Sequence, residues 1–238
     1  MEFFLENQEL LWFMVVIYDL TLAIFLFKFF GKYGLYCAVV LGIILGNLQG
    51  GKVSELEVFG LSLTVSMGAI LYSGIYFATD LLNEKYGKNE ANRAVYLGFV
   101  ANIAVMVTLW VSTIFLPSDI TGSAAAVHNA KTTLATYSPI FIIGSLTAYL
   151  SSQVFDVWFF NYLKTKTGGK KLWLRNNLST LSSQLIDTLI YQFTWVLATD
   201  LSFYEAFSIA MAKYFIKAII AVVDTFFIYL VSNWKVPN

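Results

Sequence analysis

Two apolar stretches of the sequence contain the same short polar motif, Ser-Ser-Gln-x-x-Asp, at residues 151–156 and again at residues 182–187. In an α-helix, a Gln and an Asp three residues apart lie on one face. Since an unpaired amide or carboxylate is costly to bury, each face needs a polar partner. We interpret the two faces as parts of a site that hydrogen-bonds a small polar solute on its way across a membrane.

Further ionisable residues also interrupt apolar stretches, and at 1.5 Å rise per residue Asp224 is expected at about the depth of the two Gln-Asp faces. Such groups cost a few kcal/mol each at membrane depth and usually mark a transport pathway or a buried pair. A purely structural alternative stays open. Asp187 and Lys217 would then form an ion pair between two helices, and Gln153 and Gln184 would only hydrogen-bond between helices.

The composition predicts an integral membrane protein. Of the 238 residues, 58% are hydrophobic and only 13% are charged, whereas soluble domains have about 25% charged residues. The net charge of zero argues neither for nor against a nucleic-acid partner. Because no soluble segment carries a basic stripe with interleaved aromatic residues, we expect no such partner. The single Cys37 and single His128 exclude an intrachain disulfide and a zinc site of the usual kind. We expect neither a metal nor a cofactor.

Hydropathy predicts an all-α bundle of about seven transmembrane helices. A membrane helix needs about 20 apolar residues, and seven stretches qualify: 10–30, 34–50, 59–82, 94–116, 139–163, 179–199 and 206–232. The acidic start, without a small-residue cleavage site, argues against a signal peptide. Gly42 and Gly46 form a small-xxx-small pair, which serves either packing inside the chain or a homodimer.

The basic residues predict the orientation of this bundle. With seven spans, two Lys or Arg residues fall in the connections on one side and eleven on the other. The positive-inside rule then places the N-terminus outside and the C-terminus in the cytoplasm. The connection 117–138 lies outside the membrane and is polar, so we expect either a solvated loop or a lid.

An enzyme is not indicated. The sequence contains no G-x-S-x-G, H-E-x-x-H, P-loop or glycine-rich dinucleotide motif. The GxGD context of an intramembrane aspartyl protease is missing, and no filter-like loop of a channel is present. A carrier with a small polar pocket remains.

Several segments resemble the queuosine precursor transporters, the solitary vitamin uptake transporter family that was once a domain of unknown function. These are FATDLLNEKYGKNEANRAVYLGF (77–99), GSLTAYLSSQVFDVWFFNYLK (144–164), LRNNLSTLSSQLIDTLIYQF (174–193) and KYFIKAII (213–220). The resemblance covers about residues 34–232. Family members commonly have six spans, which implies an additional N-terminal transmembrane helix in residues 1–33 and a six-helix transporter domain in residues 34–238.

The resemblance implies import of 7-cyano-7-deazaguanine, 7-aminomethyl-7-deazaguanine or queuine across the plasma membrane, for tRNA modification. With the polar motifs, it predicts a substrate site at Asp80, Glu84, Gln153, Asp156, Asn161, Gln184, Asp187 and Lys217. Asp156 or Asp187 would accept hydrogen bonds from the aminopyrimidine edge, with Gln153 and Gln184 completing the contacts and Lys217 neutralising the second carboxylate. Two alternatives remain: a substrate-binding subunit of an ATP-driven vitamin uptake system, and a structural membrane protein whose buried charges only join helices.

Overall fold

The computed structural model describes residue 4 and residues 6–50, 52–58, 60–118, 123–135 and 139–235, and almost all of them are helical. The elements are α2 (Gln8–Leu48), β1 (Val53–Val58), β2 (Leu61–Ser66), α3 (Met67–Tyr86), α4 (Lys88–Ile114), α5 (Ala124–Ala135), α6 (Pro139–Lys166), α7 (Leu172–Ala198) and α8 (Phe203–Ser232). The predicted all-α bundle is therefore confirmed as a helical architecture, with one short hairpin added.

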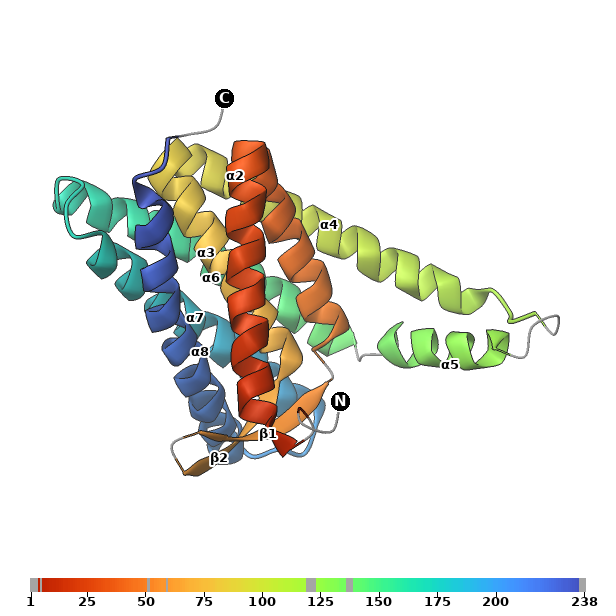
Figure 1. Ribbon diagram of the computed structural model, residues 1–238. Coiled ribbons are helices and arrows are strands. Elements are labelled where there is room, and N and C mark those ends of the chain that lie inside the picture. Colours follow the sequence, from red (N-terminus) through yellow and green to blue (C-terminus); the bar gives the residue numbers. More distant parts are fainter. Residues whose placement is uncertain are drawn as a thin grey trace.

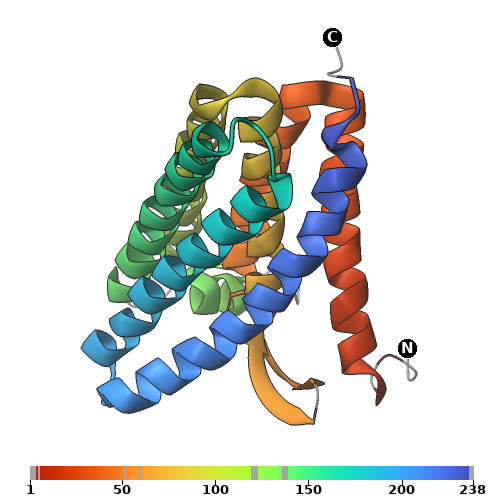
Figure 2. The ribbon, with the colours of Figure 1, turned by 90° about the vertical axis from the view of Figure 1, so that its left-hand side faces the viewer.

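Helix α2 is two helical segments joined by a sharp bend at Gly31. This residue has φ 56° and ψ −134°, a combination that only glycine adopts readily. The segments on either side match the predicted spans 10–30 and 34–50, and they lie side by side in both views (Figures 1 and 2). The bend falls two residues before the predicted domain boundary at residue 33.

The prediction of a span over residues 59–82 is wrong at its beginning. Strands β1 and β2 pair antiparallel, with Val53 opposite Ser66 and Val58 opposite Leu61, and α3 begins only at Met67. The segment LSLTVS alternates apolar and polar residues with the period of a strand, which hydropathy alone does not distinguish from a helix. Gly60, with φ 77°, occupies the turn, and residue 59 lies outside the described residues.

The connection 117–138 is also more ordered than a plain loop. It contains helix α5, whose Ala-rich sequence has high helix propensity, while residues 119–122 and 136–138 lie outside the described part. Helix α5 packs on α4, and together they diverge from the bundle (Figure 1).

The remaining helices run up and down along a common direction (Figure 2). Helix α6 packs along α7, α7 along α8, and α2 along α3. The N-terminus and the hairpin lie at one end of the bundle, and the C-terminus lies at the other (Figures 1 and 2). We name these the hairpin end and the C-terminal end.

The distribution of side chains identifies a multi-pass membrane protein. Large apolar side chains such as Phe30, Trp110 and Phe226 are 60%, 59% and 71% exposed, as expected of a surface that faces lipid. Within the described residues, four helices are long and apolar enough to cross a membrane: α2, α4, α6 from Ile140 and α8. Helices α3 and α7 are less apolar because polar side chains occupy their inward faces.

The glycines of α2 mediate packing inside the chain. A Cβ atom at Gly42 would lie 2.7 Å from Ile75 Cγ1, and one at Gly46 would lie 2.7 Å from the Tyr72 ring. Both neighbours belong to α3, which therefore covers the small-xxx-small face. Of the two roles predicted for this motif, internal packing is confirmed, and the face is not available for a homodimer.

A tighter contact joins α6 to α7 at Gly144. A Cβ atom there would lie 2.0 Å from Thr194 Cγ2 and 2.9 Å from Thr194 Cβ, which the α7 backbone fixes. We expect Gly144→Ala to force the helices apart and to lower the unfolding free energy by about 1–3 kcal/mol, as overpacking does. Thermal unfolding in detergent measures the change. The double variant, Gly144→Ala combined with Thr194→Gly, moves the small residue to the facing helix and should regain most of the lost stability. If the single and the double variant lose the same unfolding free energy, this contact does not limit how closely α6 and α7 pack.

Candidate functional site

A cavity of about 320 Å³ lies inside the half of the bundle next to the hairpin. This is near the lower limit of about 300–1,000 Å³ for small-molecule sites. The cavity reaches Val53 of β1 and Ile209 of α8, which are 51% and 37% exposed, so it extends to the hairpin end. Its lining residues are Gly46, Asn47, Gly50, Val53, Ser66, Gly68, Ala69, Tyr72, Met106, Phe141, Ile142, Ser145, Ala148, Asp187, Thr188, Tyr191, Trp195, Ile209, Lys213 and Lys217.

An ion pair between α7 and α8 forms part of the cavity wall. Lys217 Nζ donates a hydrogen bond of 2.6 Å to Asp187 Oδ2 and one of 3.2 Å to Thr188 Oγ1. Asp187 is only 7% exposed and Lys217 only 8%. Because each charge is paired with the other, the ion pair offsets part of the cost of burying both groups. The cavity therefore presents a carboxylate fixed in position by a cation.

An amide network occupies the part of the wall formed by α2, α3 and α6. Asn47 Nδ2 donates to Tyr72 Oη at 3.0 Å and to Asn102 Oδ1 at 3.2 Å. Ser145 Oγ donates to Asn47 Oδ1 at 3.0 Å. These bonds fix the orientation of the Asn47 amide, so the wall offers oriented polar groups as well as the carboxylate.

Aromatic rings form much of the remaining wall. Phe141 and Trp195 pack with their ring centroids 4.5 Å apart, and the buried Trp195 Nε1 has no hydrogen-bond partner within the described part of the chain. Lys213 Nζ lies 5.8 Å from the Tyr191 ring centroid and donates to Gln192 Oε1. Flat aromatic walls with a few oriented polar groups suit a flat heterocycle.

A second polar layer lies beyond the cavity, toward the C-terminal end. Thr180 Oγ1 of α7 donates a bond of 3.0 Å to Asp80 Oδ2 of α3. Ser183 Oγ donates one of 2.8 Å to Asp156 Oδ1 of α6. Both carboxyl groups are completely buried. We name Asp80 and Asp156 the carboxyl pair.

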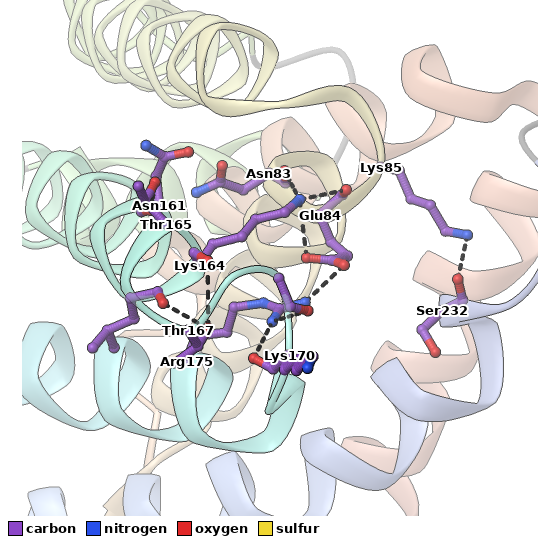
Figure 3. Close-up of polar contacts among 12 residues, drawn as sticks. Asn83, Glu84, Lys85, Asn161, Lys164, Thr165, Thr167, Lys170, Arg175 and Ser232 are labelled. Carbon is purple, nitrogen blue, oxygen red and sulfur yellow. Dashed lines mark hydrogen bonds and ion pairs between the residues drawn. The ribbon is translucent and has the colours of Figure 1, made fainter.

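A third group of polar contacts lies near the C-terminal end of the bundle, where α3 meets the α6–α7 connection (Figure 3). Glu84 of α3 pairs with Arg175 of α7 at 2.8 Å and with Lys164 of α6 at 3.2 Å. Arg175 Nη1 also donates to the carbonyl oxygens of Gly169 and Lys170 at 3.0 and 2.9 Å. These three residues, Glu84, Lys164 and Arg175, are named the Glu84 cluster. It ties the last turn of α3 to the α6–α7 connection.

Comparison with known proteins assigns the fold to a family. Residues 66–231 match the family model described as "Putative vitamin uptake transporter". The chain belongs to this transporter family. A curated relative, the "Probable queuosine precursor transporter" of Bacillus subtilis (strain 168), is 32% identical over 231 residues, which cover 95% of each chain. No solved structure matches the chain.

The transporter brings two of the eight predicted site residues into its cavity, Asp187 and Lys217. The other predicted residues lie outside it. Asp80 and Asp156 form the carboxyl pair, and Glu84 lies in the third group of polar contacts. Gln153 accepts a hydrogen bond from Thr79 at 3.3 Å. The buried Gln184 and the half-buried Asn161, which Figure 3 places next to Thr165, complete the set.

The sequence did not single out the amide network or the two aromatic residues Tyr191 and Trp195 as parts of the cavity. Asn47 is an amide in an apolar stretch, the same signal that singled out Gln153 and Gln184, but it stands alone without a repeated motif. Tyr191 and Trp195 carry no distinguishing signal in the sequence, because aromatic residues are frequent throughout the chain. Tertiary contacts decide which of them line the transporter's cavity.

Proposed function

We propose that this transporter imports 7-deazaguanine precursors of queuosine and that it binds them in the cavity at Asp187. One observation carries the proposal: a buried carboxylate, held by Lys217, lies in the wall of a cavity that also has aromatic walls and an oriented amide. The name of the Bacillus subtilis relative supports the same substrate class.

The chemistry of the substrate fits these groups. A deazaguanine ring presents a ring N–H and an exocyclic amino group side by side, and a carboxylate accepts both in a two-point interaction. The Asn47 amide oxygen accepts one hydrogen bond from Ser145 and can accept a second from a donor on the substrate. Tyr72, Tyr191 and Trp195 provide faces on which a flat bicyclic ring packs.

We propose that the hairpin end faces the outside of the plasma membrane and the C-terminal end faces the cytoplasm. Most of the basic residues outside the membrane helices lie near the C-terminal end, as the positive-inside rule requires. In this arrangement the cavity reaches the outside, and the Glu84 cluster closes the cytoplasmic end. Import then requires that the cluster opens while the hairpin end closes.

Thermal stability of the purified protein tests the substrate class directly. Binding at a hundredfold excess over Kd stabilises the folded state by about 2.7 kcal/mol. The panel contains the three deazaguanines together with guanine and adenine. We expect stabilisation by at least one deazaguanine and none by adenine, whose edge lacks the adjacent N–H donor. If no compound in the panel raises the unfolding temperature, the proposed substrate class is wrong.

Uptake into proteoliposomes that contain only this chain tests the transport step. Accumulation of a labelled deazaguanine is expected without added ATP or a partner protein. If binding is normal but uptake requires an ATPase subunit, the chain is instead the substrate-binding subunit of an ATP-driven system.

A further inference from the structure

The hydrogen bonds from the neighbouring hydroxyl groups satisfy only part of the carboxyl pair. Thr180 and Ser183 donate to one oxygen of each carboxyl group. The other two oxygens, Asp80 Oδ1 and Asp156 Oδ2, are buried and have no hydrogen-bond partner of good geometry among the residues that the structure describes, although the Ser179 hydroxyl lies near Asp156. Thr180 and Ser183 are three residues apart on one face of α7, so the two carboxyl groups that they hold lie close together.

A hydrogen bond between two carboxyl groups requires a proton. A carboxylate only accepts hydrogen bonds, whereas a protonated carboxyl group can donate one. Two carboxylates in contact at a fully buried site repel each other, which favours the state in which one of them carries a proton. The pair Asp80–Asp156 is therefore a candidate site for binding a proton.

The neighbouring cations are already paired with other groups. Arg175 and Lys164 bind Glu84, and Lys217 binds Asp187. Among the residues that the structure describes, no ion pair includes either member of the carboxyl pair, and no cluster suited to a metal ion is found. The pair therefore has no cation partner among the described residues that would let both of its members ionise.

Two further buried carboxyl groups lie in the elements packed around the pair. Asp224 of α8 hydrogen-bonds to the Asn176 side chain of α7. Asp19 of α2 lies against the backbone of Gly74, well along α3 toward the hairpin end. Neither has a cation partner among the described ion pairs, so neither supplies a positive charge that would let both members of the pair ionise.

We propose that the Asp80–Asp156 pair is the proton-binding site of a proton-coupled transporter. The proposal rests on the proposed import function and names its driving ion. Binding converts one carboxylate and one proton into a carboxylic acid, and release reverses the step. Ser183 of α7 is one helical turn from Asp187 in the cavity, and Asp80 is one turn from Glu84. A change of charge at the pair therefore occurs within one helical turn of Asp187 at the cavity and of Glu84 at the C-terminal end, so it can influence both ends of the transport pathway.

Infrared spectroscopy tests the proton without any substrate. A protonated carboxyl group has a carbonyl stretching band that a carboxylate lacks. At neutral pH, we expect the difference spectrum between the natural protein and Asp156→Asn to contain this band, and likewise for Asp80→Asn. Asp200→Asn removes an exposed carboxylate and is the matched control that should leave the band unchanged. Identical bands in all four proteins would overturn the proton site.

Transport tests the coupling. In proteoliposomes with a clamped membrane potential, an acidic exterior should raise accumulation of a labelled deazaguanine at least several-fold, and Asp156→Asn should lose this increase. Equal uptake with and without the pH gradient would overturn proton coupling and leave the import function intact. Failure to bind or take up any deazaguanine would overturn the proposed function, and the infrared result would still decide the proton site.

Discussion

Substituting Asp187 by Asn is expected to abolish binding of deazaguanines. The amide replaces one acceptor oxygen by a donor, so the aminopyrimidine edge meets a donor where it needs an acceptor. Removing one member of a buried, hydrogen-bonded charge pair costs about 2–5 kcal/mol, so we expect Kd to rise by about 30-fold to several thousandfold. Ligand-induced thermal shifts and equilibrium binding with purified protein measure the effect.

A second variant separates binding from folding. Asp187→Asn leaves Lys217 buried without its partner, and an uncompensated buried charge destabilises a protein strongly. Asp187→Asn combined with Lys217→Met removes both charges and should recover stability without recovering binding. If the double variant binds deazaguanines as the natural protein does, the ion pair is purely structural and the substrate site lies elsewhere.

Cross-linking α3 to α7 at the Glu84 cluster is expected to stop transport but to preserve binding. Glu84→Cys and Arg175→Cys, joined by a short bifunctional thiol reagent with a cleavable disulfide, replace the ion pair of 2.8 Å by a covalent tie. Because the cavity is at the other end of the bundle, the ligand-induced thermal shift should persist. Uptake should fall to the level of empty liposomes and return after reduction.

The chain allows clean controls for this experiment. Cys37, the single cysteine, is exposed, so Cys37→Ser is the background for all variants. Each single cysteine variant lacks the ion pair but cannot form the cross-link, so its uptake rate measures the effect of losing the ion pair alone. Unimpaired uptake by fully cross-linked protein, verified by mass spectrometry, would mean that the C-terminal end does not open during transport.

The sequence alone determined the membrane character and most of the helices. A span of about 20 apolar residues is a strong local signal, so the helices appear where hydropathy predicts them. The exceptions are local too: strand β2 has a period of two, and α5 lies in a polar, Ala-rich connection. Polar residues inside apolar helices were correctly expected to face inward, and Asp80, Gln153 and Asp187 are all buried.

The tertiary structure decided which of these polar residues meet. The repeated Ser-Ser-Gln-x-x-Asp motif suggested equivalent roles for Asp156 and Asp187, yet Asp156 contacts Ser183 and Asp80, whereas Asp187 contacts Lys217 in the cavity. Helical periodicity fixes the face of a residue but not its height against a neighbouring helix. Close contacts such as Gly144 on Thr194 set that height. Packing therefore places Asp187 of one copy of the motif at the cavity and Asp156 of the other copy in the carboxyl pair.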